Sequence, residues 1–329
     1  MLSNSGVDEL FIYQDMRRGM KRKLFIVFVA LFLTLLFFLA LSDRGTTRLY
    51  KELETLRFNF SRLLGDCETV PRKPDLPVIY AITPTYARPV QKAELTRLSH
   101  TFRLVPALHW IIVEDASKPS ALVGKLVNKS GIPHTILTAP TPKEWKLREK
   151  DPNWKKPRGV LQRNRALQWL RENLKPKDKA VIYFADDDNV YSLELFDEMR
   201  WTKGVSVWPV GLVGGLLVER PILNPKTGRV TGWNAAWRPE RPFPIDMAGF
   251  AISAPLLLSR PNAKFSLTSD RGFQESHLLQ ALTTRDKLEP RADRCTKVYV
   301  WHTRTESPKL NAELARRKAK KNMNDEIEV

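Results

Sequence analysis

Histidine and cysteine are scarce in this chain of 329 residues, which contains five histidines and two cysteines. Cys67 and Cys295 are too few for a disulfide framework, and they lack the spacing of a metal-binding motif. The low histidine count argues against a His-rich metal site. The GxGxxG pattern is also missing, which argues against a dinucleotide cofactor. The absences therefore point away from disulfide-rich scaffolds, His-ligated metal centres and dinucleotide-dependent enzymes.

The composition is that of a globular protein, with 43% hydrophobic and 27% charged residues and a net charge of +18. Such a length holds one large domain or two modest ones. The positive charge is partly terminal, because basic residues gather at 17–23 and 316–321. No nucleic-acid-binding motif accompanies them. A basic body also suits anionic substrates such as nucleotide sugars.

Residues 24–41 (LFIVFVALFLTLLFFLAL) form an uncharged run just long enough to span a bilayer. Basic residues precede it, so the positive-inside rule predicts a cytosolic tail at 1–23 and a lumenal remainder. The alternative is a cleaved signal peptide, with Ala40-Leu41-Ser42 as its cleavage site. The run exceeds the usual signal core, which favours an uncleaved signal-anchor. Since no second run of this length follows, we expect a single-pass type II membrane protein.

A charged stem is predicted at 42–75, where Pro71, Pro74 and Pro77 break any helix and a domain begins near residue 76. Asn59 and Asn128 begin N-glycosylation sequons, which are usable if this part is lumenal. Cys67 lies in the stem, where it either pairs between chains in an oxidising lumen or stays free.

The next segment alternates strands with helices. Apolar runs predict strands at 78–86, 109–115 and 181–184, helical spacing predicts helices at 90–103 and 160–174, and the Pro-rich stretch 139–157 is expected to be loop. This order predicts a parallel α/β sheet of nucleotide-binding type over residues 76–197. Residues 198–310 are expected to form the second half of the domain. Their predicted elements are strands and turns at 204–215 and 241–250, a loop opening a helix at 271–276, and a last strand at 298–304. Residues 311–329 form the tail.

Asp186, Asp187 and Asp188 directly follow the apolar strand at 181–184. A buried strand that ends in three acids implies repulsion and desolvation that something positive must offset. Ligands of open α/β sheets bind at the carboxyl ends of strands. Asp186 and Asp188 can face one side of the chain, so this DxD arrangement suits a hard divalent cation that bridges to a diphosphate. The alternatives are a solvated acidic turn or a cluster of acids at a helix N-terminus.

Several ungapped motifs occur in order: residues 84–88 (PTYAR), 91–95 (QKAEL), 113–115 (VED), 184–189 (FADDDN), 241–250 (RPFPIDMAGF) and 301–305 (WHTRT). Together they resemble the β-1,3-glucuronyltransferase family, over about residues 77–309. Residues 204–215 and 241–250 look most like the branch that completes the proteoglycan linker. The stem does not match, and Leu161 stands where the family has an acidic residue. The mismatch of the stem puts any family disulfide through Cys67 in doubt.

The resemblance implies an α/β GT-A glycosyltransferase fold, Mn²⁺ as cofactor, and inverting transfer of glucuronate from UDP-glucuronate. It also implies that residues 76–197 form the UDP-sugar- and metal-binding subdomain and that residues 198–310 form the acceptor-binding subdomain. Such a displacement needs one general base and no protein nucleophile. Glu275 matches the family's base, although an acid in a first helical turn is also favoured by the dipole. Asp188 matches the metal ligand, and Asp186 and Asp187 are expected to hold the ribose or metal-bound water.

The donor is expected to meet residues from both halves of the domain. Tyr86 can stack on uracil, Asp115 can accept from its imide N–H, and Pro84 and Thr85 shape the turn. Contacts with the diphosphate or with glucuronate are expected from Arg158, Arg163, His302 and Arg304. The alternatives are a core aromatic at Tyr86 and a structural histidine at His302.

The acceptor is expected to contact Glu219, Arg241, Asp246 and Arg271. Trp233 or Trp237 can stack on a sugar ring or simply belong to the core. The resemblance implies transfer to the terminal galactose of Gal-β1,3-Gal-β1,4-Xyl, by a homodimeric enzyme of the Golgi membrane. The alternatives are transfer to terminal N-acetyllactosamine, or a membrane-anchored glycan-binding protein without catalysis. The four acids at 186–188 and 275 argue against lost catalysis.

Overall fold

The computed structural model describes residues 28–29, 76–147, 151, 155–303 and 318–319. The described residues from 76 onward belong to one compact unit. Most of the predicted anchor, the stem with Asn59 and Cys67, Arg304 and most of the tail lie outside the described residues. Within the described part of the chain, no helix is long and apolar enough to cross a membrane. The anchor therefore stays a prediction.

A seven-stranded sheet with the order β11-β6-β10-β4-β1-β2-β3 forms the centre of the unit. Four of its strands are mutually parallel: β1 (Val78–Thr85), β2 (Leu108–Glu114), β3 (His134–Thr138) and β4 (Ala180–Phe184). Three of these strands were predicted. The sheet as a whole is mixed, because β10 (Phe250–Ser253) runs antiparallel to both β4 and β6 (Val205–Val207). The prediction of a parallel sheet is therefore correct only for this half.

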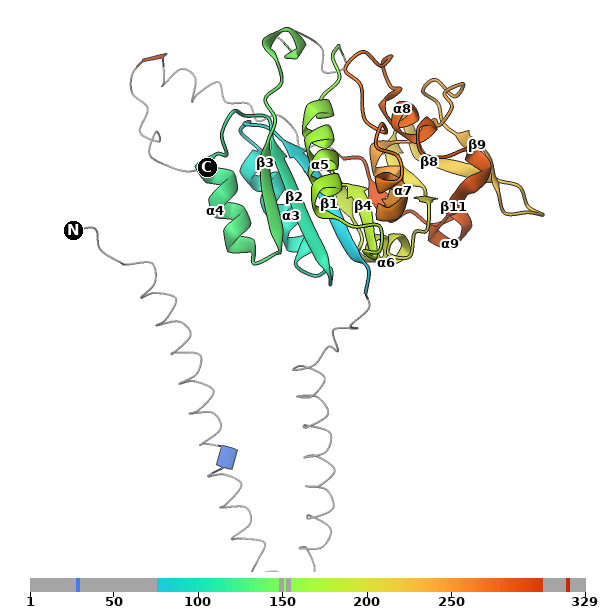
Figure 1. Ribbon diagram of the computed structural model, residues 1–329, viewed down its shortest axis with the longest axis horizontal. Helices are drawn as coiled ribbons and strands as arrows, with labels where there is room; N and C mark the ends of the chain where they lie inside the picture. Colours follow the sequence, from blue (N-terminus) through green and yellow to red (C-terminus); the bar gives the residue numbers. More distant parts are fainter. Residues whose placement is uncertain (1–27, 30–75, 148–150, 152–154, 304–317, 320–329) are drawn as a thin grey trace, which may run out of the picture. The chain divides into compact units, whose positions relative to one another are not determined.

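Helices cover both faces of the parallel half (Figure 1). Helix α5 (Val160–Asn173) packs on one face, and α3 (Gln91–Phe102) and α4 (Ala121–Ser130) pack on the other. Ile111 and Ile182 join the core under α5, whereas Trp110 and Val181 join the core under α3. Strands β2 and β4 are thus buried on both sides, which explains why their sequences are mostly apolar instead of alternating.

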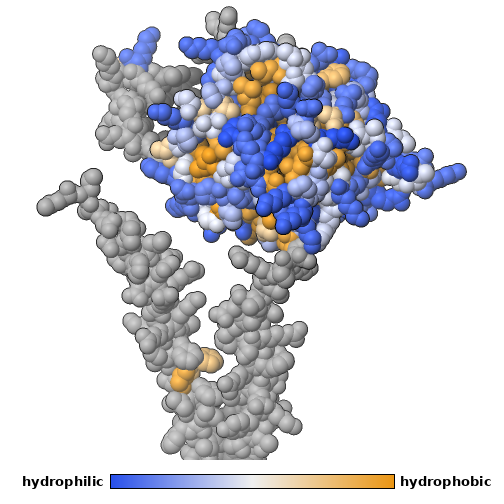
Figure 2. Space-filling model, in the orientation of Figure 1, coloured by the Kyte–Doolittle hydropathy of each residue, from blue (hydrophilic) through white to orange (hydrophobic). Residues whose placement is uncertain are grey.

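Sequence reasoning missed α4 and β3. The boundaries of α4 carry ordinary signals, because the hydroxyl of Ser120 accepts from the backbone N–H of Val123 at 3.2 Å and Gly131 ends the helix at φ 70°. Polar residues cover most of the visible face, and apolar patches lie between them (Figure 2). The polarity of the surface therefore does not reveal which element lies beneath it.

A second, five-stranded sheet has the order β5-β12-β7-β8-β9. Its strands are β5 (Val190–Tyr191), β7 (Val210–Val213), β8 (Leu216–Leu223), β9 (Val230–Asn234) and β12 (Val300–Trp301). Gly214 and Gly215 join β7 to β8 with φ values of 62° and 82°, as a tight hairpin of this twist requires. The predicted last strand, 298–304, is a two-residue strand within the described residues.

The remaining elements connect these sheets. They are α6 (Leu193–Met199), α7 (Ala254–Leu258), α8 (Gln274–Gln280), α9 (Ala292–Cys295), β11 (Leu288–Pro290), and the 3₁₀ turns Lys143–Trp145, Met247–Gly249 and Arg285–Lys287. Strands from 198–310 complete the sheet begun by 76–197. The proposed division between two subdomains stays a prediction.

The topology brings distant residues to one edge. Strands β1, β2 and β4 all end at the same side, so Tyr86, Asp115 and Asp186 follow neighbouring strand ends. In the second sheet Trp301 of β12 pairs with both Val190 and Gly211. A Cβ atom at position 211 would lie 2.5 Å from the Trp301 ring, so glycine is required for this approach. The pairing places His302 beside the acids.

Candidate active site

The loop after β1 presents Tyr86 to solvent. The Tyr86 side chain is 43% exposed, which excludes the alternative of a core aromatic. The guanidinium carbon of Arg88 lies 4.6 Å from the centre of its ring. Asp115 accepts from the backbone N–H of Thr141 at 2.7 Å, which fixes its carboxylate at the end of β2. The predicted pair of uracil contacts, Tyr86 and Asp115, therefore occupies adjacent strand ends.

The acid turn, residues 186–188, holds its three carboxylates differently. Asp186 pairs with Arg163 at 2.5 Å. Asp187 is buried, and it accepts from the Thr85 hydroxyl at 2.8 Å and lies 2.7 Å from Arg88 Nη2. Among the described residues, the Asp188 carboxylate has no hydrogen bond or ion pair. The turn is anchored there through the Asp188 carbonyl, which accepts from Arg97 at 2.8 Å and from the Thr303 hydroxyl at 2.6 Å.

Burial and the neighbouring carboxylates of Asp186 and Asp187 raise the pKa of Asp188 to about 6. An acid without a counter-charge beside two other acids is a position where a bound cation would be strongly stabilised. Within the described part of the chain, no group of three or more His, Cys, Asp or Glu side chains could hold a metal ion. The protein thus offers one open carboxylate instead of a complete cage.

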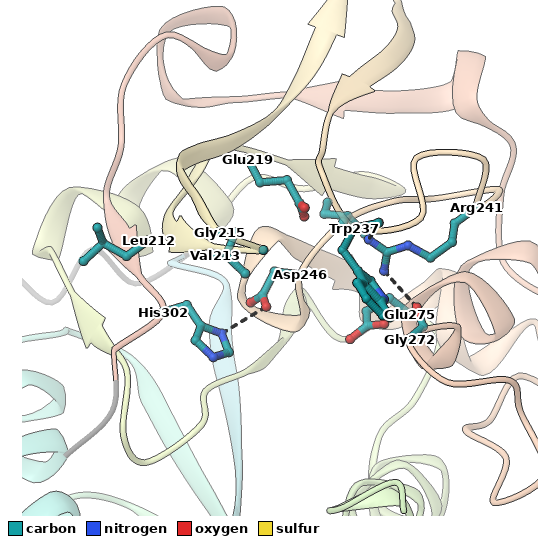
Figure 3. A pocket seen from close by; sticks show the side chains of 12 residues that line it. Leu212, Val213, Gly215, Glu219, Trp237, Arg241, Asp246, Gly272, Glu275 and His302 are labelled. Atoms are coloured by element: carbon teal, nitrogen blue, oxygen red, sulfur yellow. Dashed lines mark hydrogen bonds and ion pairs between the residues drawn. The ribbon is translucent and has the colours of Figure 1, made fainter. Parts of the chain in front are cut away.

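A cavity of about 590 Å³, called the central cavity here, is lined in part by His302, a residue close enough to Asp186 and Asp188 for their charges to raise its pKa. Its lining residues are Leu212, Val213, Gly214, Gly215, Glu219, Trp237, Arg241, Ile245, Asp246, Gly272, Glu275 and His302. Figure 3 shows Glu219, Asp246 and Glu275 around the opening, with His302 on one side and Trp237 and Arg241 on the other. It therefore unites Glu219, Arg241, Asp246, Glu275 and His302, which are five of the predicted site residues.

His302 and Asp246 form a charged pair in the central cavity. The His302 ring Nδ1 donates to Asp246 Oδ2 at 3.1 Å. This hydrogen bond to Asp246 raises the pKa of His302 to about 9, although burial opposes it. Burial would raise the pKa of Asp246, yet the hydrogen bond from His302 and its positive charge bring that pKa below the usual value. At neutral pH the cavity therefore contains an imidazolium and a carboxylate.

The other two acids of the cavity, Glu275 and Glu219, have pKa values raised towards neutrality. Burial raises the pKa of Glu275 to about 7, and the charge of Asp246 adds to this. Burial likewise raises the pKa of Glu219 to about 7, again with a contribution from Asp246. A carboxylate whose pKa lies near neutrality is well matched to accepting a proton from a hydroxyl group. Glu275 stands in the first turn of α8, so the dipole alternative describes its position but not its raised pKa.

The two candidate tryptophans have different environments. Trp237 is 40% exposed and lines the central cavity, whereas Trp233 is 8% exposed and packs against Phe243. Trp237 is therefore the ring available to a sugar, and Trp233 belongs to the core. The Arg271 guanidinium carbon lies 4.6 Å from the Trp237 ring centre, so Arg271 contacts a residue of the central cavity without lining that cavity itself.

Arg241 mainly organises the loops. Its side chain is buried and donates to the carbonyls of Gly272, Trp237 and Arg238 at 2.8, 3.0 and 3.2 Å. These bonds join the loop after β9 to the loop before α8. Its predicted contact with the acceptor stays a prediction.

Two further arginines and a sequon complete the comparison with the sequence. Arg158 is exposed, and its carbonyl accepts from Arg163 at 3.1 Å, so the two residues lie together near the acid turn. Arg304 lies outside the described residues. Asn128 is exposed at the end of α4, where its amide oxygen accepts from His134 at 3.1 Å. Its glycosylation stays a prediction.

Some residues of the site were not predicted. Leu212 and Ile245 line the cavity, while Arg97 and Thr303 hold the acid turn. Arg97 and Thr303 are separated from Asp188 by 91 and 115 positions, so local patterns cannot pair them. Arg88 lies within residues 84–88 (PTYAR), two positions after the predicted site residue Tyr86. This position was the sequence signal that could have identified Arg88.

Residues 98–306 match the model of glycosyltransferase family 43. The chain is 60% identical over 244 residues to galactosylgalactosylxylosylprotein 3-beta-glucuronosyltransferase I of Drosophila melanogaster, covering 73% of this chain and 80% of that protein. It is 57% identical over 254 residues to galactosylgalactosylxylosylprotein 3-beta-glucuronosyltransferase 3 of Homo sapiens, covering 74% and 75%.

Among solved structures, S. aureus TarS 1–349 in complex with UDP-GlcNAc superposes with a TM-score of 0.42 at 14% identity, covering 76% of this chain and 68% of that one. Family membership and the mixed seven-stranded sheet, with helices on both faces, support an α/β fold of the GT-A type. On the family match and on these identities, the chain belongs to glycosyltransferase family 43.

Proposed function

We propose that this protein transfers glucuronate, with inversion, from UDP-glucuronate to the terminal galactose of Gal-β1,3-Gal-β1,4-Xyl, forming a β-1,3 bond. It is then a galactosylgalactosylxylosylprotein 3-beta-glucuronosyltransferase of proteoglycan synthesis. The names of its relatives at 57% to 60% identity support this reaction. The observation that carries it is Glu275, an acid with a pKa of about 7 in the cavity that also contains His302, which the charges of Asp186 and Asp188 reach.

The geometry supports a single displacement. Glu275 accepts the proton of the acceptor hydroxyl as that oxygen attacks the anomeric carbon, and the bond to UDP breaks on the opposite face. No protein nucleophile is required, because one step exchanges one bond for another. Asp246 and Glu219 accept hydrogen bonds from the remaining hydroxyls of the galactose. Their placement around Glu275 orients the attacking oxygen.

The donor lies along the strand ends. Tyr86 stacks on the uracil, Asp115 accepts from the imide N–H, and the diphosphate extends to the acid turn. Arg163 and the imidazolium of His302 supply positive charge beside it, which suits the diphosphate and the glucuronate carboxylate. Arg158 and Arg304 are proposed as further cationic contacts.

The residues at the acid turn fit a divalent cation, and we propose Mn²⁺. Asp188 would hold it, because its carboxylate is the one acid of the turn without a protein partner within the described residues. Cations of this kind commonly take one or two carboxylates together with substrate phosphates, which agrees with a single open ligand. When bound, the cation neutralises charge on the departing diphosphate.

The acceptor side has room for more than one sugar. A second cavity of about 700 Å³ shares Gly214, Trp237 and Gly272 with the central cavity. Trp237 therefore belongs to the wall of both cavities, where its ring can stack on a sugar face. This supports an oligosaccharide acceptor.

We further propose a single-pass type II protein of the Golgi membrane, anchored by residues 24–41, with a lumenal catalytic part, glycans at Asn59 and Asn128, and a homodimeric state. Protease protection of residues 42–329 in sealed Golgi vesicles would test the topology. Cleavage of this part without detergent would contradict it.

The reaction is tested with the compact unit, residues 76–329, given UDP-glucuronate and Mn²⁺. Gal-β1,3-Gal and N-acetyllactosamine are offered side by side. Strict preference for the first supports the linker enzyme, whereas equal use of the second moves the proposal to glycoprotein acceptors. Metal-dependent UDP binding without transfer to either would overturn both.

A further inference from the structure

Arg88 lies where the loop after β1 meets the acid turn. Its guanidinium is 2.7 Å from Asp187 Oδ1 and also pairs with Glu94 of α3. The side chains of Arg88, Glu94 and Asp187 are 13%, 3% and 8% exposed. One buried cation therefore pairs with two buried carboxylates. Moving this cation would leave a buried carboxylate without its counter-charge.

The same guanidinium holds Tyr86. Arg88 Nη1 donates to the Tyr86 carbonyl at 3.2 Å, and the guanidinium carbon lies 4.6 Å from the ring centre. The ring nevertheless stays 43% exposed. Arg88 thus supports the ring through a cation–π contact while the ring remains available for stacking.

Asp187 links Arg88 to the rest of the acid turn. It also accepts from the Thr85 hydroxyl at 2.8 Å, and that hydroxyl accepts from Gln91 at 3.1 Å. Asp187 stands between Asp186 and Asp188 in the chain, so its side chain helps to fix the backbone from which both neighbours project, together with the bonds that Arg97 and Thr303 donate to the Asp188 carbonyl. Arg88 therefore contacts both the Tyr86 ring and the acid turn.

We infer that Arg88 is a positioning residue that couples the nucleobase-stacking ring of Tyr86 to the metal-holding acid turn, so that base and diphosphate are bound as one unit. The inference rests on the proposed function for the identity of the nucleotide. Arg88 acts through Tyr86 and Asp187 and contacts no substrate. The competing interpretation is an ion pair that only stabilises the fold.

The test measures UDP binding to the full chain by calorimetry, with and without Mn²⁺, for Arg88→Lys. Lysine keeps the charge but has one nitrogen, so it cannot donate to the Tyr86 carbonyl as Nη1 does while pairing with both acids as Nη2 does. We expect affinity for UDP with Mn²⁺ to fall about tenfold, the usual lower range for residues that orient a metal ligand. The donor KM should rise while the acceptor KM and the thermal midpoint stay near wild type. Arg103, which is exposed and follows the last residue of α3, provides the control: Arg103→Lys should change neither UDP affinity nor the donor KM.

A double-variant cycle separates positioning from plain stabilisation. If Arg88 acts through the ring, Tyr86→Ala and Arg88→Lys together should weaken UDP binding less than the sum of the two alone. Glu94→Gln leaves the Arg88–Asp187 pair in place, so UDP affinity should stay within about twofold of wild type. Fully additive losses, or an Arg88→Lys protein that binds UDP like wild type, would overturn the inference.

If Arg88→Lys fails to fold, variants of Thr85 test the same coupling. Thr85→Val removes the other donor to Asp187 and should weaken UDP binding with Mn²⁺, whereas Thr85→Ser keeps the hydroxyl and should not. Equal affinities of these two variants would count against coupling through Asp187. A wild-type protein that binds UDP with Mn²⁺ but transfers no glucuronate would refute the proposed function while leaving this comparison intact.

Discussion

At the acid turn, Asp186 and Asp187 each lie against an arginine, whereas in the central cavity Glu219 and Glu275 are acids that burial has moved towards protonation. At the acid turn, two carboxylates are therefore paired with guanidinium groups, and among the described residues Asp188 alone of the three has no such partner. In the central cavity, the pKa values of Glu219 and Glu275 lie close to neutrality, so each can exchange a proton near pH 7. Negative charge is therefore offset by arginines on the donor side, whereas on the acceptor side two acids can take up protons and Asp246 is paired with His302.

This difference follows from what each side has to do. A diphosphate with its cation needs fixed charges, because no proton moves there during transfer. An acceptor hydroxyl must lose a proton, so its site needs a carboxylate that can exchange one at working pH. His302 lies between the two sides, paired with Asp246 and close enough to Asp188 to lower its pKa.

The largest effect is expected from Glu275→Gln, which keeps the shape of the side chain and removes the proton acceptor. We expect transfer to fall about 10³-fold, within the range for a general base. UDP should still bind with Mn²⁺, because the donor side is untouched. Glu172→Gln, an exposed acid on α5, is the matched control. Loss of UDP binding in the Glu275 variant would mean that the two sides are not separate.

Asp188→Ala tests the donor side alone. Removing the open carboxylate should weaken Mn²⁺-dependent UDP binding by about 100-fold, while binding of UDP without metal changes little. Asp197→Asn, exposed on α6, serves as the control in the same titration. An unchanged metal dependence would remove Asp188 from the ligand role and leave the open acid without an explanation.

The donor side was largely predictable from the sequence, and the acceptor side was not. Continuous apolar runs identify β1, β2 and β4, and their ends carry Tyr86, Asp115 and the acids because parallel strands finish at one edge. The acceptor side is built from β8, α8 and the residue after β12, which meet through pairings such as Trp301 with Gly211. Such non-local pairing leaves no periodic pattern in the sequence from which it could be predicted. Trp233 and Trp237 likewise differ only in tertiary packing.

The pH dependence of kcat/KM should show the two sides separately. Glu275 must be ionised to accept a proton, and its pKa is raised to about 7, so activity should fall about tenfold per pH unit below 7. His302, with a pKa raised to about 9, loses its positive charge above that value, so donor binding should weaken there. His302→Gln should lose the alkaline limb and keep the acid limb. A rate independent of pH between 5 and 7 would contradict the role of Glu275.

The smallest effect is expected at Trp237, and it separates packing from recognition. Stacking contributes about 0.5–1.5 kcal/mol, so Trp237→Ala should raise the acceptor KM by about 2–10-fold with little change in the thermal midpoint. Trp233→Ala should instead destabilise the fold by about 3–5 kcal/mol, because Trp233 is buried against Phe243. Donor KM measured at saturating acceptor is the control for both. If both variants lost stability alike, Trp237 would be a core residue at the cavity wall, and sugar stacking would have to be assigned elsewhere.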